Sequence, residues 1–195
     1  MEASLFDSKP KPSGESLDVI KRELMEAATP RFPGRVFIFG SGDPSARVLL
    51  VGESPGPPDI ATGEPFTGPV GDMLRRMLVS IGLRESDCYL TNVVKFVSQG
   101  SELTPEMIAF FTPFLLREIE SVDPELIIAL GATPAKVLLE TNEPISKIRG
   151  RMREVNGRAM MPTFNPAYLL RDATKKKEVW EDMRAVREFL TSSQR

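Results

Sequence analysis

The chain has 195 residues, 41% of them hydrophobic and 27% charged, with a formal net charge of -2 at pH 7, which is ordinary for one globular domain with its own core. No apolar run approaches the ~20 residues that a membrane helix needs, and residues 1–4 do not begin a signal peptide, so we expect a cytoplasmic protein with no membrane partner. With no histidine and a single cysteine, Cys88, the chain has no histidine-based acid–base chemistry, no internal disulfide and no cysteine-rich metal site.

The first fifth of the chain leads into the fold. Residues 1–14 are rich in proline, lysine and other polar residues and predict a disordered lead-in, so a single folded domain is expected over residues 15–195. Helical spacing of apolar residues begins at Ser16 and predicts a helix that ends at Thr29-Pro30. Residues 36–39 predict a short extended segment, and residues 47–52 predict the first central strand.

Strands and helices then alternate along the chain. Further strands are predicted over about 87–94 and 126–131, and helices over about 70–81, from Thr104 onward, over 133–140 and over 175–191. Residues 151–164 predict a hairpin that turns at Asn156-Gly157. This alternation predicts an α/β fold with a parallel sheet covered by helices on both faces.

The loop after the first central strand is the part of the sequence most indicative of a binding site. Gly52 and Gly56 let the backbone approach a ligand closely, and Glu53 and Asp59 add two carboxylates beside the aromatic Phe66. In open α/β sheets ligands bind at the carboxyl ends of the strands, where this loop lies. The sequence therefore favours a pocket with acidic groups and a ring for stacking, against the alternative of an ordinary turn with solvated carboxylates.

Charge is distributed unevenly along the chain. Residues 146–177 hold nine Lys or Arg against two acids, whereas the remainder holds 16 basic and 25 acidic residues. A basic segment on an otherwise acidic protein creates a local field that attracts a polyanion. A solvated basic face is the alternative interpretation of the same pattern.

Five short motifs carry a family resemblance. They are Gly52-Glu53-Ser54-Pro55-Gly56, Gly63-x-Pro65-Phe66-x-Gly68, Thr91-Asn92-Val93-Val94-Lys95, Leu130-Gly131 and Asn165-Pro166-x-Tyr168-Leu169-Leu170-Arg171. In this order and spacing, the chain resembles family 4 of the uracil-DNA glycosylase superfamily from about residue 36 to 190. The resemblance implies a three-layer α/β/α sandwich around a central four-stranded, mainly parallel sheet. It also implies an enzyme that hydrolyses the N-glycosidic bond of uracil in DNA.

The resemblance assigns the base pocket to Ser54, Gly56, Phe66 and Asn92. An enzyme that acts on a base rotates the nucleotide out of the stack, and Phe66 would offer a face to the extruded base. Asn92 offers both a donor and an acceptor, so it can pair with the uracil edge and reject cytosine. Core packing of Phe66 and a strand-end cap at Asn92 are the alternatives that the residues alone leave open.

For the chemistry, the resemblance assigns the water-orienting carboxylate to Glu53 or Asp59 without deciding between them; Asp59 stands where the family usually has Glu. The second family motif normally begins with histidine, and here that position is Asn165. Asparagine can donate one N–H to the departing uracil but cannot become a cation, a loss that we expect to cost about 10²–10³ in rate. The alternative function is therefore a lesion-binding or weakly active member that binds DNA without efficient hydrolysis.

The resemblance places DNA contacts in the loop after Asn165 and at the start of the last helix. The residues are Ala167, Tyr168 and Leu169 as wedges in the duplex, and Arg171, Lys175, Lys176 and Lys177 as phosphate partners. An ordinary solvated helix start is the alternative for the lysines. We expect a monomer that acts on DNA containing uracil or another deaminated base.

The chain departs from family 4 at its iron–sulfur cluster, which four cysteines hold in that family. The position after Lys95 is Phe96, the helix position is Phe110 or Phe111, and the N-terminal pair is missing from residues 17–28. A cluster needs thiolates, so we predict no cluster and no other cofactor, with aromatic rings filling that volume.

Overall fold

The computed structural model describes residues 14–97 and 103–192, so the lead-in predicted over residues 1–14 lies almost wholly outside the described residues. In chain order the elements are α1 (Leu17–Arg31), β1 (Ser41–Gly42), β2 (Val48–Gly52), α2 (Pro57–Thr62), α3 (Gly68–Ser80), the 3-10 turn η1 (Glu85–Asp87), β3 (Cys88–Asn92), α4 (Pro105–Val122), β4 (Leu126–Leu130), α5 (Ala132–Leu139), α6 (Ile145–Ile148), β5 (Arg153–Val155), β6 (Arg158–Thr163), α7 (Pro166–Arg171), the 3-10 turn η2 (Ala173–Lys175) and α8 (Lys176–Ser192).

Within the described ranges, the sheet has six strands in the order β1-β3-β2-β4-β6-β5, where a central sheet of four was expected. The four inner strands are the expected ones and run parallel, whereas β1 and β5 pair antiparallel at the two edges. β5 is the first arm of the predicted hairpin, and both residues of its turn, Asn156 and Gly157, have the positive φ that a tight hairpin needs. The inner strands therefore form the predicted parallel sheet, and two short strands extend it.

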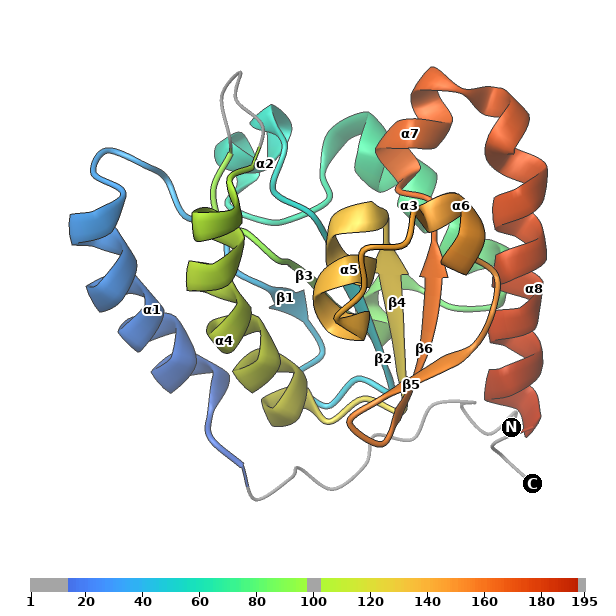
Figure 1. Ribbon diagram of the computed structural model, residues 1–195, viewed down its shortest axis with the longest axis horizontal. Coiled ribbons are helices and arrows are strands. Elements are labelled where there is room, and N and C mark those ends of the chain that lie inside the picture. Colours follow the sequence, from blue (N-terminus) through green and yellow to red (C-terminus); the bar gives the residue numbers. More distant parts are fainter. Residues whose placement is uncertain (1–13, 98–102, 193–195) are drawn as a thin grey trace.

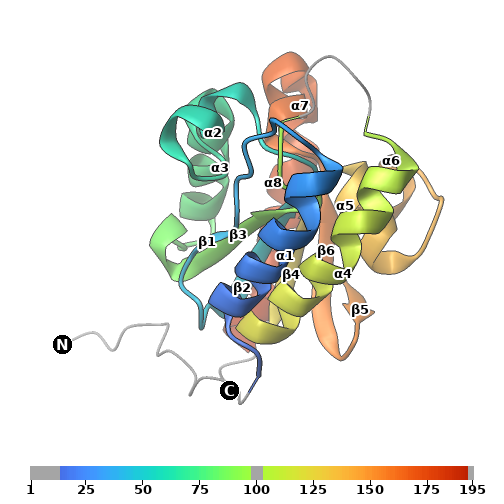
Figure 2. The same ribbon diagram turned by 90° about the vertical axis from the view of Figure 1, so that its left-hand side faces the viewer.

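Helices cover both faces of this sheet, which confirms the three-layer α/β/α architecture. Along β2, Val48 and Leu50 point into a core shared with α3, α7 and α8, and the alternate residues Leu49 and Val51 point into a core shared with α1, α4 and α5. Figure 1 shows α8 on one side of the sheet and α1 and α4 on the other, and in Figure 2 α1 and α4 lie side by side across the front. All four residues are fully buried, as interior parallel strands require.

Three segments differ from the sequence prediction. Helix α1 runs to Arg31, so Pro30 lies inside its last turn instead of ending it. The extended segment at residues 36–39 makes only an isolated bridge between Phe37 and Phe96. The predicted loop after Asn165 is helix α7. None of the helices in the described ranges is long and apolar enough to cross a membrane.

A cluster of aromatic rings joins α1, the end of β3 and α4. The ring of Phe32 lies 5.1 Å from that of Phe96 and 5.5 Å from that of Phe111, centroid to centroid, and Phe110 lies 5.0 Å from Phe111. Phe96 and Phe111 are fully buried. These are positions at which the resemblance places cluster cysteines, and packed phenyl rings offer no metal ligand. Across the described ranges, no group of three or more His, Cys, Asp or Glu side chains could hold a metal, so the residues present do not fit an iron–sulfur cluster.

The single cysteine, Cys88, is expected to be chemically silent in the folded protein. Its side chain is fully buried, and burial raises the pKa of its thiol to about 12. At about pH 8 a thiol of this kind is ionised to only about one part in 10⁴, and the thiolate is the form that reacts. We expect no reaction with Ellman's reagent in native buffer and one equivalent in concentrated guanidinium chloride. Prompt labelling of the native protein would contradict the burial of β3.

Candidate active site

A cavity of about 690 Å³ opens at the carboxyl ends of the four parallel strands, close to α2 and α7 at the top of Figure 1. Each strand end contributes to its lining: Asn92 ends β3, Glu53 follows β2, Gly131 follows β4 and Asn165 follows β6. The strand ends lie level because the strands pair in register, with Gly52 opposite Asn92. The sheet order β3-β2-β4-β6 therefore brings four segments that are distant in the sequence to one cavity.

Glu53 is an exposed carboxylate fixed from two sides. Its backbone carbonyl accepts a hydrogen bond of 3.0 Å from the N–H of Val94, which anchors it to the β3 side. One carboxylate oxygen, Oε2, accepts a hydrogen bond from the Thr133 hydroxyl at the start of α5. No ion pair engages this carboxylate in the described parts of the chain, so its second oxygen is available to a ligand in the cavity.

Asp59 is placed very differently, because the residue is only 4% exposed and its carboxylate is engaged within the loop. Oδ1 accepts from the backbone N–H of Thr67 at 2.8 Å and from its hydroxyl at 2.5 Å, and Oδ2 accepts from the N–H of Gly56 at 2.9 Å. These bonds close the segment between β2 and α3 into a fixed shape. Asp59 lines the cavity, but both of its carboxylate oxygens accept hydrogen bonds from other residues of the loop.

Phe66 and Asn92 meet at Gly52. A Cβ at Gly52 would lie 2.3 Å from Asn92 Oδ1 and 2.6 Å from Phe66 Cζ, so only glycine allows these side chains to approach the end of β2. Both side chains are nearly buried, at 6% and 3% exposed, and both line the cavity. Over the residues that the structure describes, the Asn92 amide makes no hydrogen bond, so its donor and acceptor both remain for a ligand.

A buried ion pair supports Asn92 from behind. The Lys95 ammonium is fully buried and donates to the Asn92 carbonyl at 2.8 Å, to Thr91 Oγ1 at 2.6 Å and to Glu118 Oε2 at 2.6 Å. Thr91 in turn donates to Glu118 at 2.8 Å. Desolvation lowers the pKa of Lys95, and the neighbouring Glu118 carboxylate acts in the opposite sense. The backbone of Asn92 is thus tied to a network that would be costly to break.

Asn165 caps α7, and this fixes the orientation of its amide. Its Oδ1 accepts from the N–H of Ala167 at 2.8 Å, and its Nδ2 donates to the Leu130 carbonyl at 3.1 Å. Asparagine at the N-cap followed by proline at the first helical position is a favourable helix start, which is why this segment is helical. An Asn side chain has two N–H donors, so one donor remains after these two bonds.

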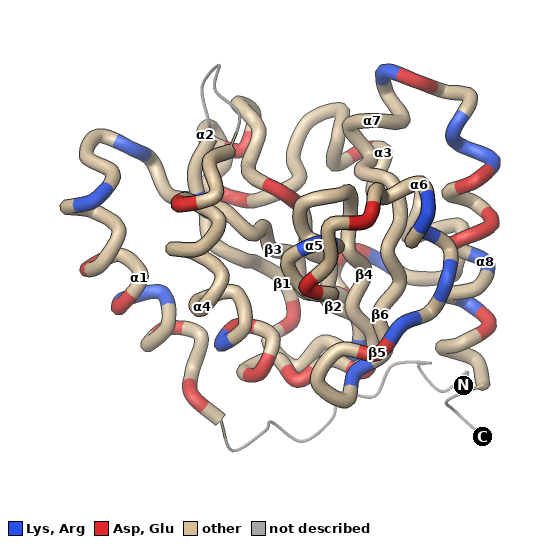
Figure 3. Tube along the Cα trace, viewed as in Figure 1, with Lys and Arg blue, Asp and Glu red and all other residues tan. Residues whose placement is uncertain are grey.

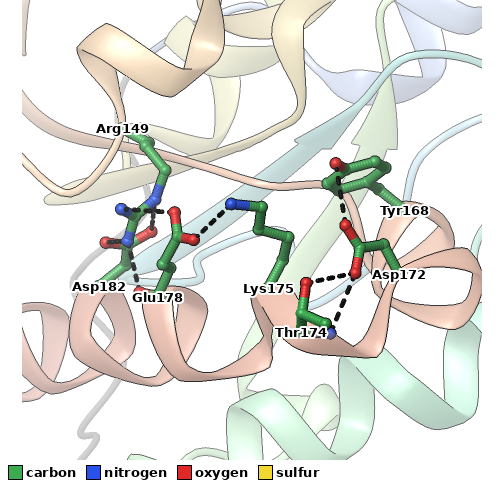
Figure 4. Close-up of polar contacts among 7 residues, drawn as sticks. All are labelled: Arg149, Tyr168, Asp172, Thr174, Lys175, Glu178 and Asp182. Atoms are coloured by element: carbon green, nitrogen blue, oxygen red, sulfur yellow. Dashed lines mark hydrogen bonds and ion pairs between the residues drawn. The ribbon is translucent and has the colours of Figure 1, made fainter.

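The wall of the cavity opposite α2 is built by α7, η2 and α8, whose polar contacts Figure 4 shows. Arg149 reaches across to Asp182 and to Glu178 on α8, and Glu178 also accepts from the Lys175 ammonium at 2.7 Å. The Glu178 carboxylate raises the pKa of Lys175. Burial raises the pKa of Asp182, with Thr163 and Arg149 acting in the opposite sense. Lys175, predicted as a phosphate partner, is therefore held in an ion pair at the cavity wall.

The cavity is lined by every predicted site residue except Leu169, Lys176 and Lys177. Leu169 is a correction: it is 1% exposed and packs in the core beneath α7, so it is not available as a wedge. The burial follows from the helix, because a helical 166–171 turns Leu169 toward the sheet and leaves its neighbour Leu170 47% exposed. The accessible apolar side chain of this segment is Leu170.

Several residues of the cavity were missed by the sequence analysis. Ile145, Ser146, Phe164 and Glu178 line it together with Leu130 and Gly131, which the motifs had marked. Phe164 directly precedes Asn165 at the end of β6, so its place beside a site follows once that strand is known to be parallel. Ile145, Ser146 and Glu178 lie in helices, and no local pattern distinguishes them from other helical residues.

The basic segment of residues 146–177 runs from the cavity rim along α6 to β5, where Figure 3 shows a succession of blue positions. Three of its cations are neutralised locally: Arg149 pairs with Asp182, Arg158 with Asp123 at 2.8 Å, and Lys175 with Glu178 at 2.7 Å. The others make no ion pair within the described ranges; they are Lys147, Arg151, Arg153, Arg171, Lys176 and Lys177. Of these six, Arg171 lines the cavity.

Comparison with known proteins identifies the family. A family model described as "Uracil DNA glycosylase superfamily" matches residues 39–184. A type-4 uracil-DNA glycosylase of Thermotoga maritima is 36% identical over 158 residues, which cover 78% of this chain and 82% of the relative. The type-4 uracil-DNA glycosylase of Archaeoglobus fulgidus is 31% identical, over 92% of this chain and 96% of the relative. That of Saccharolobus solfataricus is 34% identical, over 78% of this chain and 76% of the relative. The chain therefore belongs to the uracil DNA glycosylase superfamily, and its sequence is family 4-like.

Proposed function

We propose that this protein is a DNA glycosylase that removes uracil, or a related deaminated base, by flipping the nucleotide and hydrolysing its N-glycosidic bond in base excision repair. One observation carries this proposal: Glu53, Phe66, Asn92 and Asn165 line the same cavity although they come from three segments that are distant in the sequence. A cavity with one face for stacking, one free amide and one reachable carboxylate has the groups that base removal needs.

Recognition of the base rests on Phe66 and Asn92. The ring of Phe66 forms part of the cavity wall, which supports a stacking role for it against the extruded base. Uracil presents an N–H and a carbonyl oxygen on one edge, and the unengaged Asn92 amide can satisfy both. Cytosine would leave a donor facing a donor there, and unpaired polar groups of this kind are what make a pocket reject the wrong base.

Glu53 takes the role of the water-orienting carboxylate. It is exposed to the cavity and has one oxygen without a partner among the described residues, whereas the carboxylate of Asp59 is engaged by the loop. Water would attack C1′ of the sugar as its bond to the base nitrogen breaks, with the water proton passing to Glu53. The negative carboxylate also stabilises the positive charge that develops on the sugar. Asp59 is then a positioning residue that holds the loop.

Asn165 receives the leaving base. The hydrogen bonds to Ala167 and Leu130 fix the orientation of its amide and leave its second N–H as a hydrogen-bond donor. A donor directed at a carbonyl oxygen of uracil stabilises the anion that forms as the glycosidic bond breaks. A neutral amide stabilises this anion less than a cation does, so we expect a slower enzyme than one with histidine at this position.

The DNA partner would lie across the cavity mouth. Leu170, Tyr168 and Ala167 on α7 would occupy the gap that the flipped nucleotide leaves, and Arg171 and the lysines at the start of α8 would contact phosphates. Residues 15–195 would act as one domain, since both cores pack on the same sheet. The protein would act as a monomer, and a reduced buried cysteine is in keeping with the cytoplasm.

The test is a strand-scission assay. The protein is incubated with labelled oligonucleotides that carry U·G, U·A, single-stranded U or hypoxanthine, and abasic sites are then cleaved with alkali. We expect scission at uracil and none on a control oligonucleotide with thymine. Binding to the uracil duplex without scission on any substrate would replace this proposal with the lesion-binding alternative.

A further inference from the structure

We propose that the β4–α5 turn, residues 130–133, is the positioning element of the site and that the Thr133 hydroxyl orients the Glu53 carboxylate for attack by water; this inference rests on the proposed function. Thr133 belongs to none of the motifs that carry the family resemblance. It is separated from Glu53 by 80 residues in the chain, and the sheet brings them together.

The contact with Glu53 is specific to the hydroxyl of Thr133. Thr133 Oγ1 donates to Glu53 Oε2, and the carboxylate has no other hydrogen bond or ion pair in the described ranges of the chain. The N-cap of α5 is Gly131, so Thr133 is not the cap of its own helix. Without this bond the Glu53 side chain would be held only through its backbone, by the bond from Val94. A long exposed carboxylate would then sample several rotamers, of which few place an oxygen beside the attacking water.

The same turn holds the second reacting side chain. The carbonyl of Leu130 accepts from Asn165 Nδ2 at 3.1 Å, and the side chain of Thr133, three residues further along, donates to Glu53. Gly131 has a φ of +108°, and a Cβ there would lie 3.3 Å from the Cβ of Asn165, so the turn fits closely against Asn165. A single short segment therefore sets the spacing between the carboxylate that activates water and the amide that receives the base.

The role predicts a defined kinetic pattern for Thr133→Val, which keeps the shape and removes the hydroxyl. We expect the single-turnover rate of uracil excision to fall by about tenfold to a hundredfold, the range for a misoriented reacting group. The dissociation constant for uracil DNA should stay within about twofold, because Thr133 is not among the residues that line the cavity. Thr133→Ser retains the hydroxyl and should restore most of the wild-type rate.

A double-mutant cycle with Glu53→Ala separates orientation from a general structural effect. If Thr133 acts through Glu53, the loss caused by Thr133→Val disappears in the Glu53→Ala background. The wild type, the two single variants and the double variant are also unfolded in urea. The change in the free energy of unfolding caused by Thr133→Val should likewise vanish when Glu53 is replaced by alanine. This second measurement reports the contact even if the protein hydrolyses no DNA, so failure of the proposed function is recognised separately.

Three kinetic results would overturn the inference. They are a Thr133→Val rate equal to that of the wild type, an equal loss for Thr133→Ser, and an undiminished loss in the Glu53→Ala background. Absence of any coupling in the urea series would remove it as well.

Discussion

Glu53→Gln is expected to lower the single-turnover rate of uracil excision by about 10²–10⁴-fold, the usual contribution of a positioned general base. Glutamine keeps the size of the side chain and can still accept from Thr133, but it cannot take the water proton or balance the charge on the sugar. Glu53 is exposed, so the variant should fold as the wild type does and bind uracil DNA with a similar dissociation constant. Rapid-quench assays with enzyme in excess measure the rate, and fluorescence anisotropy measures binding.

Glu64→Gln is the matched control for this prediction. It removes a carboxylate from the same connection between β2 and α3, and Glu64 is exposed and does not line the cavity. Its rate should equal that of the wild type.

Asp59→Asn tests the other acid of the loop, and we expect it to lower thermal stability together with activity. An active Glu53→Gln beside a stable, inactive Asp59→Asn would show that the two acids had been assigned the wrong way round.

Lys95→Met is expected to lower the free energy of unfolding by about 3–5 kcal/mol, the cost of leaving one member of a buried ion pair alone. Glu118, at 4% exposed, and Thr91 would lose their donor, and so would the Asn92 carbonyl. Replacing both charges in Lys95→Met/Glu118→Leu should recover most of this loss, because apolar side chains of similar size avoid the desolvation of two ions. Urea unfolding followed by circular dichroism measures the three stabilities.

The control is Lys147→Met, which removes an exposed lysine and should change stability by less than about 0.5 kcal/mol. A Lys95→Met protein as stable as this control would mean that the buried network does not form. The double variant has a further use, since it removes the donor to the Asn92 carbonyl while the fold is kept. Its rate of uracil excision therefore reports how far the backbone of Asn92 depends on that bond.

The fold was largely predictable because its strongest signals are local. The apolar runs that became β2 and β4 cannot be solvated, and Asn156-Gly157 is compatible with few turns other than a hairpin. Helix α7 was mistaken for a loop although Asn165-Pro166 is a favourable helix start, because a Pro near a strand end also indicates a turn. Edge strand β1 has two residues, too few to leave a periodic pattern.

The motifs predicted most of the residues that meet at the cavity, but not how each of them is engaged there. The motifs left Glu53 and Asp59 as alternatives for the water-orienting acid, and only their burial and hydrogen-bond partners distinguish the two carboxylates. Leu169 was misassigned because the face of α7 that meets the core depends on how the helix docks on the sheet. Contacts such as that between Thr133 and Glu53 join residues that are neighbours only after the strands pair.

The two short strands at the sheet margins have a consequence for behaviour in concentrated solution. A parallel sheet that ended on β3 or β6 would present a row of unsatisfied backbone groups to any other extended chain. Here one margin ends in a two-residue strand and the other in a three-residue strand that carries the exposed charges Arg153 and Glu154. Neither offers a template long enough for strand addition, which guards the native protein against polymerising through its sheet.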